Sequence, residues 1–409
     1  MRRLLALTAA ASLLVAGCSA PSDDTSGAGG SGGDRPVEGA DSAGAAGGTA
    51  DAGESGQLDE GFAVTEHGTF DEGWSMAFLP GGEHLLVAER GGGLKLRDQA
   101  TGGVIDVEGA PEVRHAGQGG LHDVIPGPTF ADDGTVYLSW VRDHPDGAQG
   151  VVGRGTLDVG GGQLSGLDVI WEQTPAEGSG HFALRMLVQG DHLFITTGDR
   201  QEFTPAQDTS NNLGAIVRLT LDGEPAPGNP WAGEGDDRPA GETEGDDKSA
   251  ELWSIGHRNP LGIAEDADGA IWSSEMGPQG GDELNRIEAG ANYGWPEASM
   301  GVHYGGDDIP DHSDGDGFTA PSAHWVPAMS PGNLMIYRGS LFDGWRGSAL
   351  LGGLSGQKIV RVDLDGDRAT VAEEWDMGER IRAIDEAPDG SLWVLEDGAG
   401  GRLLQLRPK

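Results

Sequence analysis

The stretch Asp389-Gly390-Ser391-Leu392-Trp393-Val394 places an Asp-Gly turn directly before a run of aliphatic and aromatic residues. The same arrangement recurs at residues 82–87, 133–138, 190–195, 268–273 and, more weakly, 347–352. Another short apolar run usually precedes the turn, as at 76–79, so each unit has the pattern of a β-hairpin. From about Phe62 onward, no long stretch shows the 3.6-residue period of a helix. The chain is therefore predicted to be all-β.

The number and spacing of these units predict the architecture. Six units within residues 61–409 leave about 50 to 60 residues each, enough for a four-stranded sheet and a long loop. A six-bladed β-propeller with long loops over one face is the expected fold. Because the spacing is irregular, periodicity alone leaves a large β-sandwich open. In a propeller the loops meet around a central channel, so residues distant in sequence can form one site.

The first 60 residues have a different composition from the rest. Arg2 and Arg3 precede an apolar run at 4–16 that is short for a membrane span, which predicts a lipoprotein signal peptide over residues 1–17. The run ends in Leu-Val-Ala-Gly-Cys at 14–18, which is similar to a bacterial lipobox and implies a lipid anchor on Cys18. An ordinary signal peptide is the alternative.

The segment after the lipobox is predicted to be a tether. Residues 18–60 are rich in Gly, Ala, Ser and acidic residues, with almost nothing to bury, and are expected to be disordered. Residues 61–409 remain as one propeller domain. Together these features predict an exported protein that only its lipid holds at the outer side of the bacterial cell membrane.

Composition excludes several classes of function. The 409 residues carry a formal charge of -41, most of it within residues 61–409, so no positive field would attract nucleic acid or anionic lipid. A single Cys allows neither an internal disulfide nor a Cys-rich zinc site. With 36% hydrophobic residues and 11 Trp, the chain can still build a sizeable core.

Two loop segments carry candidate ligand-binding or catalytic side chains. Gln118 stands beside two glycines at 119–120, which would let the backbone approach a ligand, although a Gly-rich turn explains them equally. His181 lies among small residues just before an expected strand, where its neutral form could act as a general base. A surface or structural histidine is the alternative for that segment.

Two further segments suggest ion binding. The Gly277-Pro278 turn and the carboxylates of Asp282 and Glu283 offer hard oxygen ligands suited to Ca²⁺, although their spacing is not that of an EF-hand. Arg380 and Arg382 are two residues apart and so lie on one side of a strand, where they could bind a ligand with several carboxylates. Pairing with the acidic surface is the alternative for these arginines.

Taken in order, these segments resemble the glucose/sorbosone dehydrogenase family, whose members are soluble aldose dehydrogenases that depend on pyrroloquinoline quinone (PQQ) and fold as six-bladed propellers. The resemblance runs from about Gly73 to the C-terminus. The motifs that carry it are Gly-Gln-Gly-Gly at 117–120, His-Phe at 181–182 with Arg185, Gly-His-Arg-Asn-Pro at 256–260, Gly-Pro at 277–278, Gly-Gly-Asp-Glu at 280–283, Asn-Tyr-Gly-Trp-Pro at 292–296 and Arg-Ile-Arg at 380–382.

The resemblance implies a PQQ-dependent aldose sugar dehydrogenase that produces lactones. His181 matches the base that takes the proton of the anomeric hydroxyl while the C1 hydride passes to C5 of the quinone. The matches to cofactor contacts are Gln118, Arg258, Asn259, Tyr304, Arg380 and Arg382. The electrons are expected to leave to an external acceptor, and no motif identifies that acceptor, the preferred sugar or the oligomeric state.

The resemblance also implies calcium. The backbone carbonyls of Gly277 and Pro278 match ligands of a Ca²⁺ that would polarise PQQ as a Lewis acid. Glu283 and Tyr293 match a second, structural calcium site that some members have.

The chain departs from the family pattern at two positions. Met276 replaces a His that many members have before Gly-Pro, and Ser355 replaces a Lys that contacts PQQ in relatives. Lys358 could substitute for that Lys only if its loop were rearranged, so weaker cofactor binding is expected. These departures keep open a non-catalytic, calcium-binding propeller displayed at the cell surface. A lactonase-type hydrolase is a further alternative, but it leaves the arginine pair unexplained.

Overall fold

The structure is a computed structural model that describes residues 61–232 and 247–409. The predicted signal peptide, the lipid anchor on Cys18 and the tether lie outside the described residues. The described residues all belong to one compact unit, Ser55–Lys409. Among the described residues, no helix has the length and apolar character needed to cross a membrane.

The described residues form six four-stranded antiparallel sheets, the blades of a propeller. Blade 1 contains β2 (Gly73–Phe78), β3 (His84–Glu89), β4 (Leu94–Asp98) and β5 (Val104–Asp106). Blade 2 contains β6 (Leu121–Pro126), β7 (Thr135–His144), β8 (Gly147–Asp158) and β9 (Gln163–Glu172). Blade 3 contains β10 (Ala183–Gln189), β11 (His192–Thr197), β12 (Ala215–Thr220) and β13 (Leu252–Ile255).

The remaining blades follow in chain order. Blade 4 contains β14 (Pro260–Glu265), β15 (Ile271–Glu275), β16 (Asp282–Ile287) and β17 (Ala323–Trp325). Blade 5 contains β18 (Pro331–Ile336), β19 (Ala349–Gly353), β20 (Lys358–Asp365) and β21 (Arg368–Asp376). Blade 6 contains β22 (Ile381–Glu386), β23 (Leu392–Glu396), β24 (Ala399–Pro408) and β1 (Phe62–Asp71). The short helical turns are α1 (Phe130–Asp133), η1 (Thr204–Gln207) and η2 (Ser249–Glu251).

The predicted six-bladed, all-β fold is confirmed. Each turn-and-strand unit found in the sequence is the second strand of a blade: β3, β7, β11, β15, β19 or β23. These strands are buried at nearly every position, as in β15 and β23, because a neighbouring blade covers each face. A strand covered on both faces has a continuous apolar run instead of an alternating pattern, which made these strands recognisable.

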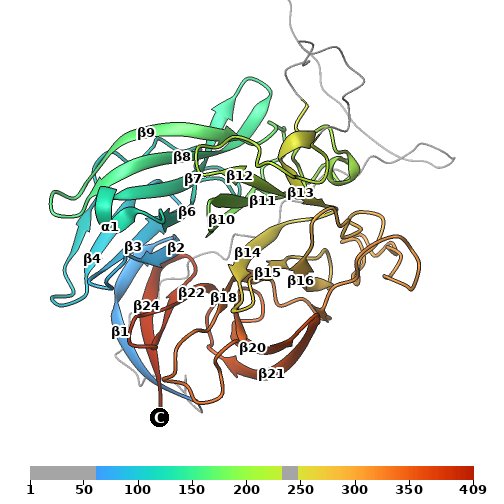
Figure 1. The fold of residues 1–409 in the computed structure, drawn as a ribbon. Helices are drawn as coiled ribbons and strands as arrows, with labels where there is room; N and C mark the ends of the chain where they lie inside the picture. Colours follow the sequence, from blue (N-terminus) through green and yellow to red (C-terminus); the bar gives the residue numbers. More distant parts are fainter. Residues whose placement is uncertain (1–60, 233–246) are drawn as a thin grey trace, which may run out of the picture. The chain divides into compact units, whose positions relative to one another are not determined.

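The innermost strands form a ring around the central channel. β2, β6, β10, β14, β18 and β22 each contact the next, and β22 contacts β2 (Figure 1). Hydrophobic residues pack between neighbouring blades, such as Trp272 between blades 4 and 5 and Tyr137 between blades 2 and 3. Fully burying one large apolar side chain stabilises the fold by about 1.5–3 kcal/mol.

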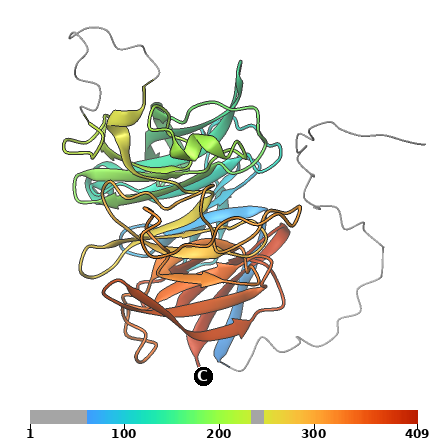
Figure 2. The ribbon, with the colours of Figure 1, turned by 90° about the vertical axis from the view of Figure 1, so that its right-hand side faces the viewer.

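The two ends of the propeller close the ring. β1 pairs with the C-terminal strand β24, from Phe62 opposite Pro408 to Asp71 opposite Ala399 (Figures 1 and 2, blue beside red). This pairing completes blade 6 and covers an edge of β24 that would otherwise be open to other chains. Apart from β1, which joins blade 6 from the N-terminal side, the strands of every blade follow one another outward from the innermost strand. The innermost strands therefore all begin at the same face of the propeller. Loops from different blades therefore meet there.

Candidate active site

The centre of the site is a buried pair of side chains, His181 and Asp199. His181 precedes β10 and Asp199 follows the paired strand β11, so one hairpin carries both. His181 Nδ1 lies 2.6 Å from Asp199 Oδ1, and both side chains are buried. Gly198 permits this approach, because a Cβ there would clash with the carbonyl oxygen of His181.

The surroundings of this pair fix its protonation. Burial opposes ionisation of Asp199, but His181, Arg258 and the backbone N–H of Gln201 together lower its pKa. Burial and the positive charge of Arg258 lower the pKa of His181, against the opposing effect of Asp199. At neutral pH the carboxylate is therefore ionised and accepts the Nδ1 proton of a neutral imidazole. Nε2 then carries the basic lone pair, and it makes no hydrogen bond within the described ranges.

Two further groups hold the pair in place. The indole Nε1 of Trp295 donates to Asp199 Oδ2 at 2.7 Å. The backbone N–H of His181 donates to Gln118 Oε1 at 2.8 Å, and the N–H of Gln118 donates to the carbonyl of Ser179, also at 2.8 Å. Gln118 thus reaches the predicted base from the loop before β6. Its amide Nε2 makes no hydrogen bond to a described residue and could donate to a ligand.

Arg258 and Asn259 lie directly before β14, at the same face. Arg258 Nη1 donates to the carbonyls of Met276 and Gly277 at 3.0 and 2.7 Å, and Nη2 donates to the hydroxyl of Tyr304 at 3.2 Å. No described carboxylate pairs with Arg258, whose buried Nε has no partner. The Asn259 side chain is 1% exposed and its Oδ1 also has no partner. Since buried polar groups are normally hydrogen-bonded, both residues have the character of ligand contacts.

The predicted pair Arg380 and Arg382 converges on one carboxylate. Nε of each arginine donates to Asp397 at 2.7 Å, one to each carboxylate oxygen. Arg382 is buried over the ring of Trp74, 3.7 Å from its centroid, and burial lowers the pKa of Arg382 to about 10. Arg380 is largely exposed. Two cations against one acid leave positive charge at this side of the channel, in a chain that is otherwise strongly acidic.

The carboxylate of Asp282 holds the turn that carries Gly277 and Pro278. Asp282 accepts backbone N–H bonds from Gly277 at 3.0 Å and from Met329 and Ser330 at 2.6 Å, so both its oxygens are engaged by the protein. The Gly277 carbonyl accepts the bond from Arg258 described above. It could serve as a calcium ligand only after that guanidinium turned away.

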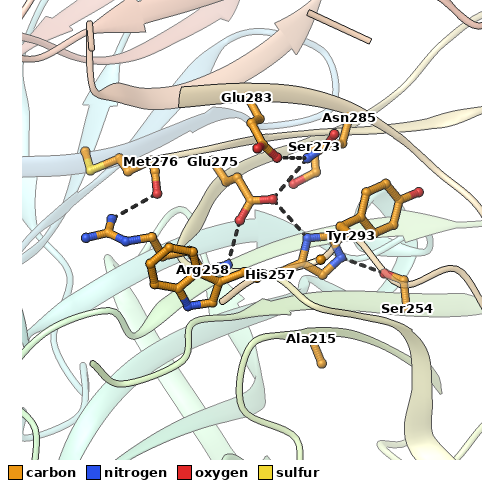
Figure 3. Close-up of polar contacts among 12 residues, drawn as sticks. Ala215, Ser254, His257, Arg258, Ser273, Glu275, Met276, Glu283, Asn285 and Tyr293 are labelled. Carbon is orange, nitrogen blue, oxygen red and sulfur yellow. Dashed lines mark hydrogen bonds and ion pairs between the residues drawn. The ribbon is translucent and has the colours of Figure 1, made fainter. Parts of the chain in front are cut away.

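Figure 3 shows the buried network behind this turn. The amide of Asn285 donates to Glu275 and to Glu283, at 3.0 Å in both cases. Glu275 also accepts the backbone N–H of Arg258 at 2.7 Å and lies 3.1 Å from His257 Nδ1. Burial and the negative charge of Glu275 raise the pKa of Glu283 well above its usual range. A proton or a bound cation would relieve this repulsion between two buried acids.

The predicted ligand pair Glu283 and Tyr293 lines one small cavity with Glu275 and Ser299. The Tyr293 hydroxyl donates to the carbonyl of Arg286 at 2.5 Å and accepts the N–H of Glu288 at 3.0 Å. Because the hydroxyl is engaged in this way, the backbone oxygen of Tyr293 is the better candidate ligand. Within residues 61–232 and 247–409, no three His, Cys, Asp or Glu side chains group closely enough to hold a metal ion. Backbone carbonyls would have to complete any calcium site here.

The position of the missing family Lys is occupied by hydroxyl groups. Ser355 Oγ lies 2.8 Å from Ser330 Oγ. Lys358 does not replace the absent cation, because its Nζ donates to Glu374 on the neighbouring strand at 2.9 Å.

Sequence reasoning missed three partners of the predicted residues. Asp199 and Asp397 each stand just after the second strand of a blade, at the site face, and Trp295 belongs to the 292–296 motif without having been assigned a contact. A polar residue that directly follows a buried second strand was the available signal for the two acids.

Known proteins resemble this chain over nearly all of its described length. The profile of the family described as "Glucose / Sorbosone dehydrogenase" matches residues 70–405. Aldose sugar dehydrogenase YliI from Escherichia coli (strain K12) is 34% identical over 348 residues, which are 83% of this chain and 91% of that protein. The crystal structure of the soluble aldose sugar dehydrogenase from Escherichia coli in the apo-form has a TM-score of 0.78 at 32% identity, covering 85% of this chain and 100% of that one. The PQQ-bound form of aldose sugar dehydrogenase from Streptomyces coelicolor has a TM-score of 0.69 at 29% identity, covering 85% and 98%.

Proposed function

The chain belongs to the glucose/sorbosone dehydrogenase family, as its sequence predicted, and from this premise we propose that it oxidises aldose sugars to lactones with PQQ as cofactor. A relative of the same fold binds PQQ, and relatives are named for their action on aldose sugars. The observation that carries the proposal is the buried Asp199–His181 pair, in which the Nε2 atom of His181 makes no hydrogen bond to a described residue.

His181 is the proposed general base. With Nδ1–H donated to the Asp199 carboxylate, Nε2 can accept the proton of the sugar's C1 hydroxyl, and Asp199 stabilises the imidazolium that results. Trp295 and the N–H of Gln201, 2.8 Å from Asp199 Oδ1, keep that carboxylate in its orientation. The remaining change at C1 is loss of a hydride, for which proteins have no side-chain acceptor. Bound PQQ would supply that two-electron acceptor.

The residues at the channel mouth suit an anionic, planar cofactor. Arg258, Arg380 and Arg382 offer guanidinium groups, which pair well with carboxylates, and Asn259 and Gln118 offer amide groups with free hydrogen-bonding capacity. The unpartnered Oδ1 of Asn259 and Nε of Arg258 are the features of this chain that best fit a missing ligand. Ser355 contributes no charge, so we expect the affinity for PQQ to be lower than a lysine at that position would give.

Two calcium sites are part of the proposal. The carbonyls of Gly277 and Pro278 would hold one ion near the cofactor once Arg258 has released Gly277. The second ion would lie between Glu275 and Glu283, where two buried acids share one amide. That ion would stabilise the fold and take no part in catalysis.

Reconstitution tests the proposed activity. Purified full-length protein with added PQQ and Ca²⁺ should oxidise aldoses in a dye-linked assay, and His181→Ala should abolish turnover while still binding the quinone chromophore. His192→Ala is the matched control, because His192 begins β11 at the opposite end of the same hairpin. Calcium binding without uptake of PQQ would favour the non-catalytic, calcium-binding propeller. A wild-type protein that binds PQQ but oxidises no aldose would also disprove the proposed activity.

A further inference from the structure

Phe203 occupies an unfavourable backbone conformation beside the candidate base. Its φ and ψ are 64° and -77°, and the N–H of Thr204 donates to the carbonyl of Glu202 at 2.9 Å. These features define a γ-turn of the rare, strained form in which the central residue has a positive φ. A residue with a Cβ adopts this conformation only where the surrounding structure imposes it, and such residues gather at functional sites.

The strained turn presents an aromatic ring to solvent. Phe203 is 41% exposed, and its inner face stacks on Trp295 with ring centroids 5.7 Å apart and an interplanar angle of 28°. The ring of His303 packs edge-to-face with that of Phe203, with centroids 6.0 Å apart. Because Trp295 donates to Asp199, the exposed ring of Phe203 is separated from the Asp199–His181 pair by one side chain.

The exposure and the chemistry of Phe203 suit a ligand that exchanges with solvent. Arg258, Asn259 and Arg382, which are proposed to hold the cofactor, are buried, whereas Tyr304 and Arg380 are exposed, as Phe203 is. Unlike these five residues, Phe203 carries neither a charge nor a hydrogen-bonding side chain for an anionic cofactor. Its free ring face is instead open to a molecule that enters and leaves at every turnover.

We propose that Phe203, supported by Trp295, binds the C–H face of a pyranose ring and so positions the sugar beside His181. The inference rests on the proposed function, since it takes the substrate to be an aldose. A pyranose presents C–H groups from its ring faces, and the electron-rich face of an aromatic ring attracts such groups. The stacked indole fixes the orientation of the phenyl ring, so little rotamer freedom remains to be lost on binding.

Two substitutions separate recognition from packing. Phe203→Leu keeps the Cβ, the apolar character and the backbone strain but removes the aromatic face. We expect KM for aldopyranoses to rise about two- to tenfold, in the range that aromatic contacts contribute, with kcat and PQQ affinity unchanged. Phe203→Tyr retains the ring and should keep KM within about twofold of the wild type. Thermal midpoints of the three proteins should agree within a few degrees.

A readout without turnover distinguishes failure of this inference from failure of the proposed function. The probe is 1,5-anhydro-D-glucitol, a pyranose without the anomeric hydroxyl, added to PQQ-loaded protein. Saturation-transfer NMR should show transfer to its ring protons in the wild type and in Phe203→Tyr, with loss in Phe203→Leu. This transfer pattern in a protein that oxidises no aldose would disprove the proposed enzymatic activity but support sugar binding at Phe203. Unchanged KM and unchanged transfer in Phe203→Leu, or equal losses in Leu and Tyr, would overturn the assignment of Phe203.

Discussion

Asp199 Oδ1 lies 2.6 Å from His181 Nδ1, across the hairpin of β10 and β11. This contact sets which imidazole nitrogen carries the proton. We predict that Asp199→Asn lowers kcat about 10²- to 10⁴-fold, because a neutral amide neither selects the tautomer nor stabilises the imidazolium. The measurement is dye-linked turnover at saturating PQQ. Asp191→Asn, in the exposed turn of the same hairpin, should leave turnover unchanged; equal losses in both variants would assign the effect to the fold.

The lowered pKa of His181 predicts the acid limb of the pH profile. Burial and Arg258 lower this pKa from its ordinary value near 6.5, so the acid limb of kcat/KM should be centred below pH 6.5. The unfolded chain would bind a proton on this histidine near pH 6.5 while the folded chain would not, so the free energy of unfolding should also decrease below that pH. A limb centred above pH 6.5 would contradict the role of His181.

Arg200 is predicted to hold the loop of His181. This fully buried guanidinium donates to the carbonyls of Gly180 at 2.9 Å, Ala148 at 3.1 Å and Gly178, and its Cζ lies 3.5 Å from the ring centroid of Phe182. Arg200→Met should lower the free energy of unfolding by about 2–5 kcal/mol, because the carbonyls of Gly180 and Gly178 lose their donor and that of Ala148 keeps only the N–H of Ala176.

Chemical denaturation of the cofactor-free protein measures this loss. The control is Arg407→Met, since Arg407 forms a half-exposed ion pair with Asp389 that should contribute at most about 1 kcal/mol. If the two variants lose equal stability, the buried hydrogen bonds of Arg200 contribute no more to the fold than an exposed ion pair does.

Glu283 is predicted to couple calcium to stability. In cofactor-free protein, Ca²⁺ at a hundredfold excess over its Kd should stabilise the fold by about 2.7 kcal/mol, or roughly 5 °C in Tm. Glu283→Gln should abolish this shift. In EDTA the variant should melt no lower than the wild type, because it removes one of two repelling acids. If Ca²⁺ raised the Tm of Glu283→Gln as much as that of the wild type, the ion would have to bind at another place.

Restoring a cation at Ser355 should strengthen cofactor binding. Ser355→Lys replaces a hydroxyl that contacts the hydroxyl of Ser330 with a positively charged group. We expect the Kd for PQQ to fall up to about tenfold. The chromophore of bound quinone gives the titration. Lys358→Met removes a lysine that pairs with Glu374 and should leave Kd unchanged. No gain from Ser355→Lys would mean that this loop does not reach the cofactor.

The fold could be predicted because its strongest signal lies in its most buried strands. The second strand of each blade is apolar on both faces and follows a turn, so β15 and β23 stand out as continuous runs. The outermost strands carry no such signal. β5, for example, is exposed at all three residues. The number of blades could therefore be predicted from the sequence, but the outer strands of each blade could not.

A contact within the site could be predicted only where the sequence motifs include both of the residues that form it. Gln118 and His181 were both selected, and the structure joins them with a hydrogen bond. The acids behind the selected residues were missed, because Asp199 and Asp397 stand one strand away from the residues that they contact. The bond from Arg258 to Gly277 was also unforeseen, since spacing does not show that one predicted contact engages another.

Blade 6 is assembled from both ends of the chain, with β1 beside β24, and it carries Arg380, Arg382 and Asp397. The two arginines therefore belong to a blade that neither end of the chain can complete alone. Loss of β1 by proteolysis or truncation would leave the hairpin of His181 and Asp199 in blade 3, but it would open the edge of β24 in the blade that carries the arginines.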